Sequence, residues 1–172
     1  MRTRLRSQGG FGLVELLIAM LMLNIGLLAV VAAFSSGIVS LNRASRITTA
    51  SVLADQQMEL YRALTYSAIR LDSTAVAGVD NTYLCDATLG GACPNSTSSL
   101  ITATCSGPPD ECNPSRVVTG ADRKSYRVDT YIVSTTPTGG RPVKKITIVV
   151  RDAANLAVTF VRQASTFDQS TG

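Results

Sequence analysis

The apolar run over residues 11–34 limits what this chain can fold into more than any other feature of the sequence. It contains one ionisable residue, Glu15, and it is longer than the roughly 20 residues that a helix needs to cross the hydrocarbon core of a membrane. Basic residues precede the run at Arg2, Arg4 and Arg6, whereas the next one after it is Arg43. Because basic residues favour the cytoplasmic side, the sequence predicts one membrane-spanning helix with a cytoplasmic N-terminus and the remainder outside.

Two simpler interpretations compete with this one. A secretory signal peptide has a shorter apolar region, about 7–15 residues, followed by a cleavage site with small residues. The run here is longer, and no clear A-x-A sequence follows it. A plain membrane anchor is the other alternative, and Glu15 argues against it, because ionisable residues inside a membrane span are uncommon and usually have a partner.

The residues before and around Glu15 form a short but demanding pattern. A basic leader ends at Gly10, and Phe11, Gly12, Leu13 and Val14 then lead to Glu15 and the long apolar helix. This pattern resembles the class III signal of type IV prepilins and pseudopilins, G|F-T-L-[IV]-E, with Gly12 at a variable position that usually holds threonine. The resemblance implies a structural subunit of a type IV pilus or pilus-like filament.

The resemblance also implies how the N-terminus is processed. A membrane peptidase would cut after Gly10 and methylate the new amino terminus at Phe11, and glycine lets the backbone approach the catalytic carboxylates without a Cβ in the way. The freed ammonium of one subunit would then pair with Glu15 of its neighbour, since a buried charge left alone is costly and a well-placed pair offsets much of that cost.

Partners and location follow from the same resemblance. We expect other pilin subunits, the prepilin peptidase/methyltransferase, the inner-membrane assembly machinery and, before assembly, membrane lipid as partners. The expected protein is a single-pass cytoplasmic membrane protein that moves to an extracellular, cell-surface pilus. A minor pilin is the preferred interpretation, a pseudopilin of a type II secretion system is the alternative, and a membrane-anchored binding domain is less favoured.

The interior of the apolar run suggests a subgroup. The segment LLIAMLMLNIGLLAV looks like the minor-pilin subgroup called PilV, or like pseudopilins of the GspI type. Asn24 and Gly26 interrupt the run, and we expect helix–helix packing there, with local unwinding as the alternative. No proline precedes Pro94, so the helix lacks the break that major pilins show.

Four cysteines lie close together at Cys85, Cys93, Cys105 and Cys112. An even number in an exported chain favours two disulfides. The spacing lacks the close C-x2-4-C pairs of most zinc sites and the chain has no histidine, so we predict no metal site. Three pairings are possible, and the local one, Cys85 with Cys93 and Cys105 with Cys112, is slightly preferred.

No catalytic constellation is visible in the sequence. It contains no G-x-S-x-G sequence, no Walker sequence and no histidine for a triad, and we predict neither enzymatic activity nor a cofactor. The net charge of +4 comes largely from the leader arginines, so nucleic-acid binding is not indicated.

The rest of the chain predicts an α+β fold. Apolar residues at helical spacing extend the N-terminal helix to about residue 64, and alternating patterns predict antiparallel strands at 125–134, 143–151 and 156–163, with short strands near 100–104 and 116–118. This order matches the type IV pilin fold, a long N-terminal α-helix with a transmembrane first half, packed on a small antiparallel β-sheet with a disulfide-containing loop region. The predicted boundaries are a cleaved basic leader (1–10), the membrane or filament-core helix (11–34), its amphipathic continuation (35–66), the irregular loop region with the cysteines (67–124), the β-meander (125–164) and a flexible tail (165–172).

Overall fold

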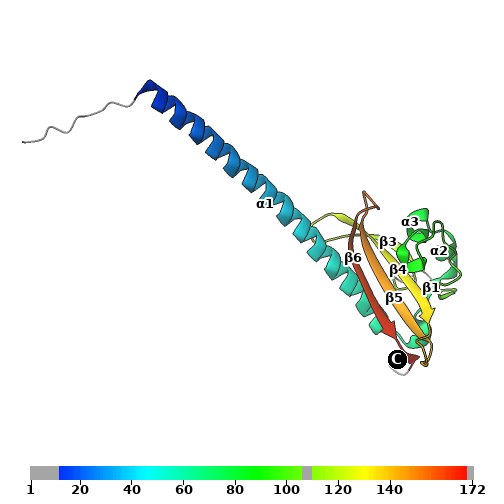
Figure 1. Ribbon diagram of the computed structural model, residues 1–172. Coiled ribbons are helices and arrows are strands. Elements are labelled where there is room, and N and C mark those ends of the chain that lie inside the picture. Colours follow the sequence, from blue (N-terminus) through cyan, green and yellow to red (C-terminus); the bar gives the residue numbers. More distant parts are fainter. Residues whose placement is uncertain (1–11, 106–109, 170–172) are drawn as a thin grey trace, which may run out of the picture. The chain divides into compact units, whose positions relative to one another are not determined.

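The computed structural model describes residues 12–105 and 110–169. The chain forms two compact units, Met1–Arg43 and Ala44–Gly172, and the helix α1 (Leu13–Arg62) contributes to both of them (Figure 1). Each unit is described by itself below.

α1 is a single helix of 50 residues without a break. Its sequence is rich in leucine, alanine and methionine, which are strong helix formers, and it contains no proline. The helix ends at Arg62 rather than near residue 64, because the N–H of Leu64 donates to the carbonyl of Tyr61, three residues back, and Thr65 is extended. Such a tightened last turn is a common way to end a helix.

The unit Ala44–Gly172 is built on a four-stranded antiparallel sheet in the order β3-β4-β5-β6. The strands are β3 (Ser115–Thr119), β4 (Ser125–Thr135), β5 (Val143–Asp152) and β6 (Thr159–Phe167). The prediction of an antiparallel meander is confirmed for β4, β5 and β6, and the short strand predicted near 116–118 is β3 at one edge.

β6 differs from its predicted range at both ends. It begins at Thr159 instead of residue 156, because Asn155 starts a turn in which its carbonyl accepts from the N–H of Val158 and its side chain accepts from that of Ala157. It continues to Phe167, so the first residues of the predicted tail are strand. An alternating pattern alone does not show where such a turn ends and the strand begins.

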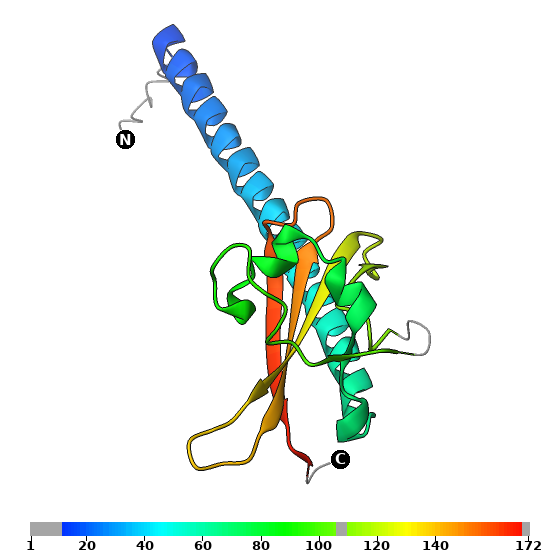
Figure 2. The same ribbon diagram turned by 90° about the vertical axis from the view of Figure 1, so that its right-hand side faces the viewer.

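The two faces of the sheet are covered by different parts of the chain (Figure 2). The helix face carries Tyr126, Val128 and Ile132 of β4 and packs against the last turns of α1, where Ala50, Ala54, Met58 and Tyr61 are buried. The loop face carries Arg127, Asp129 and Tyr131 and packs against residues 73–89. Every residue of β4 from Tyr126 to Ile132 is therefore buried.

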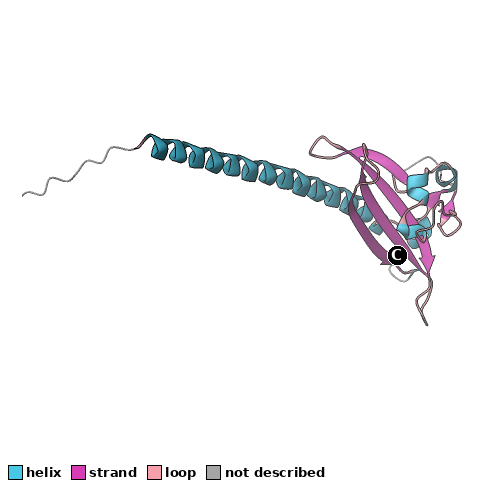
Figure 3. Cartoon of the chain, turned by 45° about the horizontal axis from the view of Figure 1, so that its top comes forward, coloured by secondary structure: helices cyan, strands magenta, loops and turns pink. Residues whose placement is uncertain are grey.

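The segment covering the loop face is more regular than predicted (Figure 3). It contains the 3-10 helix η1 (Tyr66–Ala68), the strand β1 (Leu71–Asp72), the helices α2 (Ser73–Ala77) and α3 (Asn81–Leu84), the 3-10 helix η2 (Ala87–Leu89) and the strand β2 (Thr102–Ala103), which pairs parallel with β1. Asp72, Asp80 and Asp86 cap α2, α3 and η2, because each carboxylate accepts a backbone N–H of the helix that follows it.

Candidate functional site

The first turn of α1 holds the one carboxylate of the apolar run. The carbonyl of Gly12 accepts hydrogen bonds from the N–H groups of Glu15 (3.0 Å) and Leu16 (3.2 Å), which closes this turn. Glu15 is exposed, and its negative charge interacts favourably with the helix dipole there. None of the ion pairs between described residues includes Glu15, so this part of the chain supplies no partner for the charge.

The helix surface after Glu15 is apolar on every side. All large apolar side chains from Leu13 to Leu41 are between 52% and 79% exposed. An exposed apolar surface of this extent is unfavourable in water and indicates a lipid or protein environment. α1 is the one helix in the described residues that is long and apolar enough to span a membrane, although a signal sequence near an N-terminus can meet the same minimum of length and hydrophobicity.

Two polar side chains in the apolar part of this helix donate to its own backbone. The Asn24 side-chain amide donates to the carbonyl of Met20 (2.9 Å), and the Ser35 hydroxyl donates to that of Val31 (3.0 Å). In a membrane such bonds lower the cost of burying polar groups. The helix continues through Asn24 and Gly26 without unwinding in this structure.

The predicted cleavage and methylation residues, Gly10 and Phe11, lie outside the described residues. Their roles, and that of Glu15 in assembly, stay predictions.

A second group of functional side chains lies in the other unit, between the loop face and residues 80–88. Asp129 on β4 accepts from the Nε atoms of Arg127 (2.7 Å) and Arg151 (3.1 Å). Arg127 also pairs with Asp80, and Arg151 also pairs with Asp86. The charges thus alternate in sign through a layer from which water is largely excluded.

Asp86 lies at one end of this network and is almost completely buried. Both of its oxygens accept from Arg162 of β6, each at 2.8 Å. Burial alone would raise the pKa of Asp86, but hydrogen bonds from Arg162 and Thr88 outweigh that effect and hold the pKa at about 2. Burial would also lower the pKa of Arg127, but Asp80 and Asp129 raise it above its usual value. The network therefore stays charged and fastens the loop region to the sheet.

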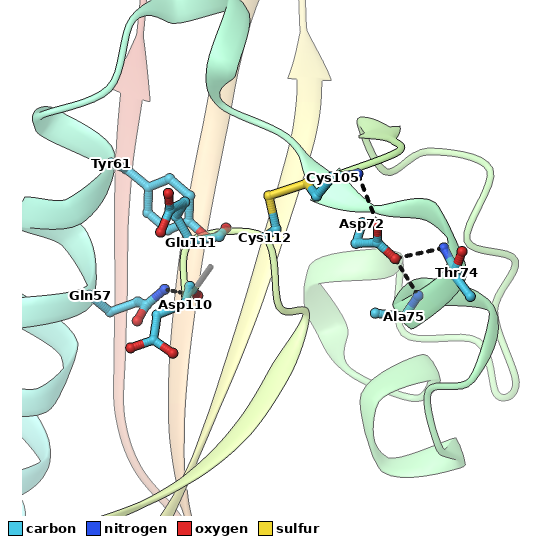
Figure 4. The surroundings of a disulfide bond; sticks show 9 residues. All are labelled: Gln57, Tyr61, Asp72, Thr74, Ala75, Cys105, Asp110, Glu111 and Cys112. Atoms are coloured by element: carbon cyan, nitrogen blue, oxygen red, sulfur yellow. Dashed lines mark hydrogen bonds between the residues drawn. A yellow bond between two sulfur atoms is a disulfide. The ribbon is translucent and has the colours of Figure 1, made fainter. Parts of the chain in front are cut away.

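The cysteines form the two local disulfides, Cys85–Cys93 and Cys105–Cys112. Around the second one, the Asp72 carboxylate caps α2 and also accepts the N–H of Cys105 at 3.0 Å (Figure 4). On the other side, the Tyr61 hydroxyl donates to the carbonyl of Glu111, and the Gln57 side chain donates to that of Asp110. Burial raises the pKa of Tyr61 to about 12, so its hydroxyl stays protonated and remains a donor.

These contacts give the cysteine region a structural role. The Cys105–Cys112 disulfide links the chain after β2 to the chain before β3. Gln57 and Tyr61 of α1 bind the backbone next to this disulfide. With all four cysteines in disulfides, no thiol is left as a nucleophile.

The apolar helix, Glu15 and the cysteines have clear signals in the sequence, whereas the ion network has none. The Asp-Ser-Thr, Asp-Asn-Thr and Asp-Ala-Thr sequences at residues 72, 80 and 86 are visible capping signals. The pairing of Asp80 and Asp86 with arginines of the sheet has no local signal, because the partners are separated by 47 to 76 residues.

Comparison with known proteins gives one match. The family model described as the prokaryotic N-terminal methylation motif matches residues 5–31. A search of curated proteins and a search of solved structures each found nothing that matches the chain. The motif implies processing by a prepilin peptidase and belongs to a structural, not an enzymatic, family.

The fold is consistent with that motif. The last turns of a long N-terminal helix pack on a four-stranded antiparallel sheet. Two disulfides crosslink the loop region that connects the helix to the sheet in the chain. This arrangement is a pilin-like α+β fold. The chain is therefore a type IV pilin-like protein that carries the N-terminal methylation motif.

Proposed function

We propose that this chain is a minor subunit of a type IV pilus, cut after Gly10, methylated at Phe11 and assembled through the apolar part of α1. The observation that carries the proposal is the combination of an exposed apolar surface, from Leu13 to Leu41 of α1, with one carboxylate in its first turn, Glu15, that pairs with no other described residue. Lipid covers this surface before assembly, with the N-terminus cytoplasmic. The same helices of other pilin subunits cover it in the cell-surface filament, to which the inner-membrane assembly machinery delivers the subunit.

The partner of Glu15 in this proposal is the new amino terminus of a neighbouring subunit. Two opposite charges removed from water need each other, because either one alone would cost several kcal/mol. Only a neighbour whose Phe11 lies beside Glu15 satisfies both charges, so the pair selects one axial position among those that apolar packing allows.

Mass spectrometry of the N-terminus tests this proposal directly. In protein from membranes and from sheared filaments we expect N-methylated Phe11 as the first residue. Gly10→Val should leave the precursor uncut, because the added side chain obstructs the approach of the peptidase to the backbone. A membrane-anchored binding domain, in contrast, would begin at Met1 or at a later signal-peptidase site.

A pseudopilin of a type II secretion system is the second candidate, because the segment LLIAMLMLNIGLLAV resembles GspI-type pseudopilins as well as PilV-type minor pilins. Both functions require the same processing, so N-terminal analysis does not separate them. A deletion strain does: loss of surface pili supports the pilus, whereas retention of a normally secreted folded protein inside the cell supports the secretion system.

A further inference from the structure

β6 is an open edge of the sheet, since no strand of the described residues lies beyond it. Among the described residues, its backbone makes no hydrogen bond to another backbone group except in its ladder with β5. Edge strands commonly carry a feature that discourages further pairing, such as a proline, an outward lysine, a bulge or a very short length. β6 has nine residues and no proline, and its charged residue, Arg162, is held by Asp86. Its bulge lies at the start of the strand, at Phe160, and leaves Val161 to Phe167 in a regular ladder. The strand is thus a template for pairing with another extended strand.

The opposite edge, β3, has the direction that such a partner needs. Each strand of the sheet is antiparallel to its neighbour, so β3 and β6 run in opposite directions. Two copies in the same orientation can therefore place β3 of one copy beside β6 of the other as an antiparallel pair. Antiparallel pairing of β6 with β6 would instead reverse one α1 relative to the other, which two helices entering one membrane from the same side cannot do.

The side chains of the two edges are complementary on the loop face. Val117 of β3 is 66% exposed, more than any other large apolar side chain of the unit Ala44–Gly172. It lies on the loop face because it is opposite Arg127 in the ladder. Beside β6, the same face has a hollow of about 310 Å³ whose walls include Val133, Thr147 and Ala164. This hollow is large enough for a valine side chain.

We propose that β3 of a second copy, in the same orientation, pairs antiparallel with β6 and inserts its Val117 beside Ala164. The common orientation rests on the proposed function, in which α1 anchors every copy in the membrane or the filament. The pairing leaves one free edge on each side, so copies that lie side by side, even the few of a minor subunit, pair in an open row without closing into a dimer.

The proposed position of Val117 also fixes a shift between neighbouring copies. Within one sheet, Val117 pairs with Arg127, Arg127 pairs with Arg151, and Arg151 pairs with Thr159. Val117 and Thr159 therefore lie at the same height along the strands. Ala164 pairs with Thr147, four residues from Arg151 along β5, because the bulge in β6 adds one residue between Thr159 and Val161. At about 3.3 Å per residue, a neighbour must be displaced by about 13 Å along the strands. The array is therefore staggered.

Cysteine cross-linking in the full-length protein tests this contact. The native cysteines are all in disulfides, so a short bismaleimide reagent should react only with introduced thiols. In membranes and sheared filaments we expect V117C/A164C to give a ladder of dimers, trimers and larger products. V117C alone and A164C alone should give no ladder, and V117C/T159C reports on an unshifted register. Val117, Thr159 and Ala164 are exposed, so these variants should fold and keep both native disulfides.

Each result decides one point. A cross-linked dimer from A164C alone would show symmetric pairing of β6 and overturn the proposal. A ladder through T159C in place of A164C would overturn the register. If filament protein begins at N-methylated Phe11 but V117C/A164C gives no ladder, the edge pairing is wrong and the proposed function stands. If the ladder forms in protein that begins elsewhere, the edge pairing stands and the proposed function is wrong.

Discussion

At the scale of residues, three aspartates organise the loop region that follows α1 in the chain and covers the loop face of the sheet. Asp72, Asp80 and Asp86 each begin a short helix, and two of them also bind arginines of the sheet. Their capping role could be predicted from the local sequence. Their ion pairs could not, since each depends on which strand the fold brings within reach.

Asp86→Asn should destabilise the protein strongly. Asparagine is as good a helix cap as aspartate, so the substitution removes only the charge. It leaves Arg162 without its carboxylate and the buried Arg151 with Asp129 as its one remaining counter-charge. We expect a loss of about 3 kcal/mol in the free energy of unfolding, measured by urea titration of the full chain in detergent micelles. The matched control is Asp80→Asn, whose side chain is 49% exposed and which should cost less. Equal losses for the two variants would contradict the importance of burial here.

The depressed pKa of Asp86 also predicts how stability depends on pH. A carboxyl whose pKa is lower in the folded than in the unfolded protein stabilises the fold above the unfolded pKa, near 4, and this contribution is lost as pH falls through the folded value, about 2. We expect the Asp86 contribution, on the order of 2 kcal/mol, to disappear between about pH 4 and pH 2. Comparing urea titrations of the native chain and Asp86→Asn over this range isolates it, because the difference between them should shrink as pH falls.

Glu15→Ala should separate processing from assembly. The proposed cleavage is at Gly10, so cleavage and methylation should remain normal. Incorporation into filaments should fall at least about tenfold, because the ammonium of the neighbouring subunit would be buried without its partner. The ratio of sheared-filament protein to membrane protein measures this effect. Glu15→Gln, which keeps the shape and removes the charge, should behave like Glu15→Ala, and normal assembly of Glu15→Gln would contradict the electrostatic role.

At the scale of elements, the Cys105–Cys112 disulfide joins segments that the sheet does not hold together. The carbonyl of Cys112 accepts the N–H of Asp72, so the same few residues connect β1, α2 and the chain entering β3. Cysteine spacing could suggest a local crosslink, but only the fold shows that Gln57 and Tyr61 of α1 donate hydrogen bonds to the backbone beside it.

Replacing both Cys105 and Cys112 with serine should loosen this junction. We expect a loss of about 2–3 kcal/mol in stability, as is typical for a short disulfide loop. In hydrogen exchange of the full chain, protection should decrease around Asp72 and β3, while residues 13–40 of α1 keep theirs. The Cys85/Cys93 double serine variant is the control and should affect α3 and η2 instead. Titration of free thiols in the native exported protein would contradict both disulfides.

At the scale of the whole molecule, the order of helix, loop region and sheet could be predicted because each part has its own periodicity. The apolar run of α1 and the alternation in β4 and β5 are local signals, and they located these elements to within a few residues. The covering of the loop face could not be predicted, because Arg127 and Asp129 read as the exposed side of a half-buried strand. Their burial depends on partners at Asp80 and Arg151, which come from other elements. The predicted site at Gly10, Phe11 and Glu15 rests on a short motif, so its residues are visible in the sequence, and the partners that we propose for them belong to other molecules.

Between Leu13 and Phe34, Glu15 is the one charged side chain, whereas the Asn24 side chain donates to the carbonyl of Met20 in its own helix. Parallel helices with such surfaces can slide past each other at little energetic expense until the charge is met. Moving the acid by four residues, with Glu15→Ala and Ala19→Glu together, should then seat the subunit about 6 Å away along the helix axis instead of excluding it. The position of a single carboxylate would then set the axial spacing of the subunits.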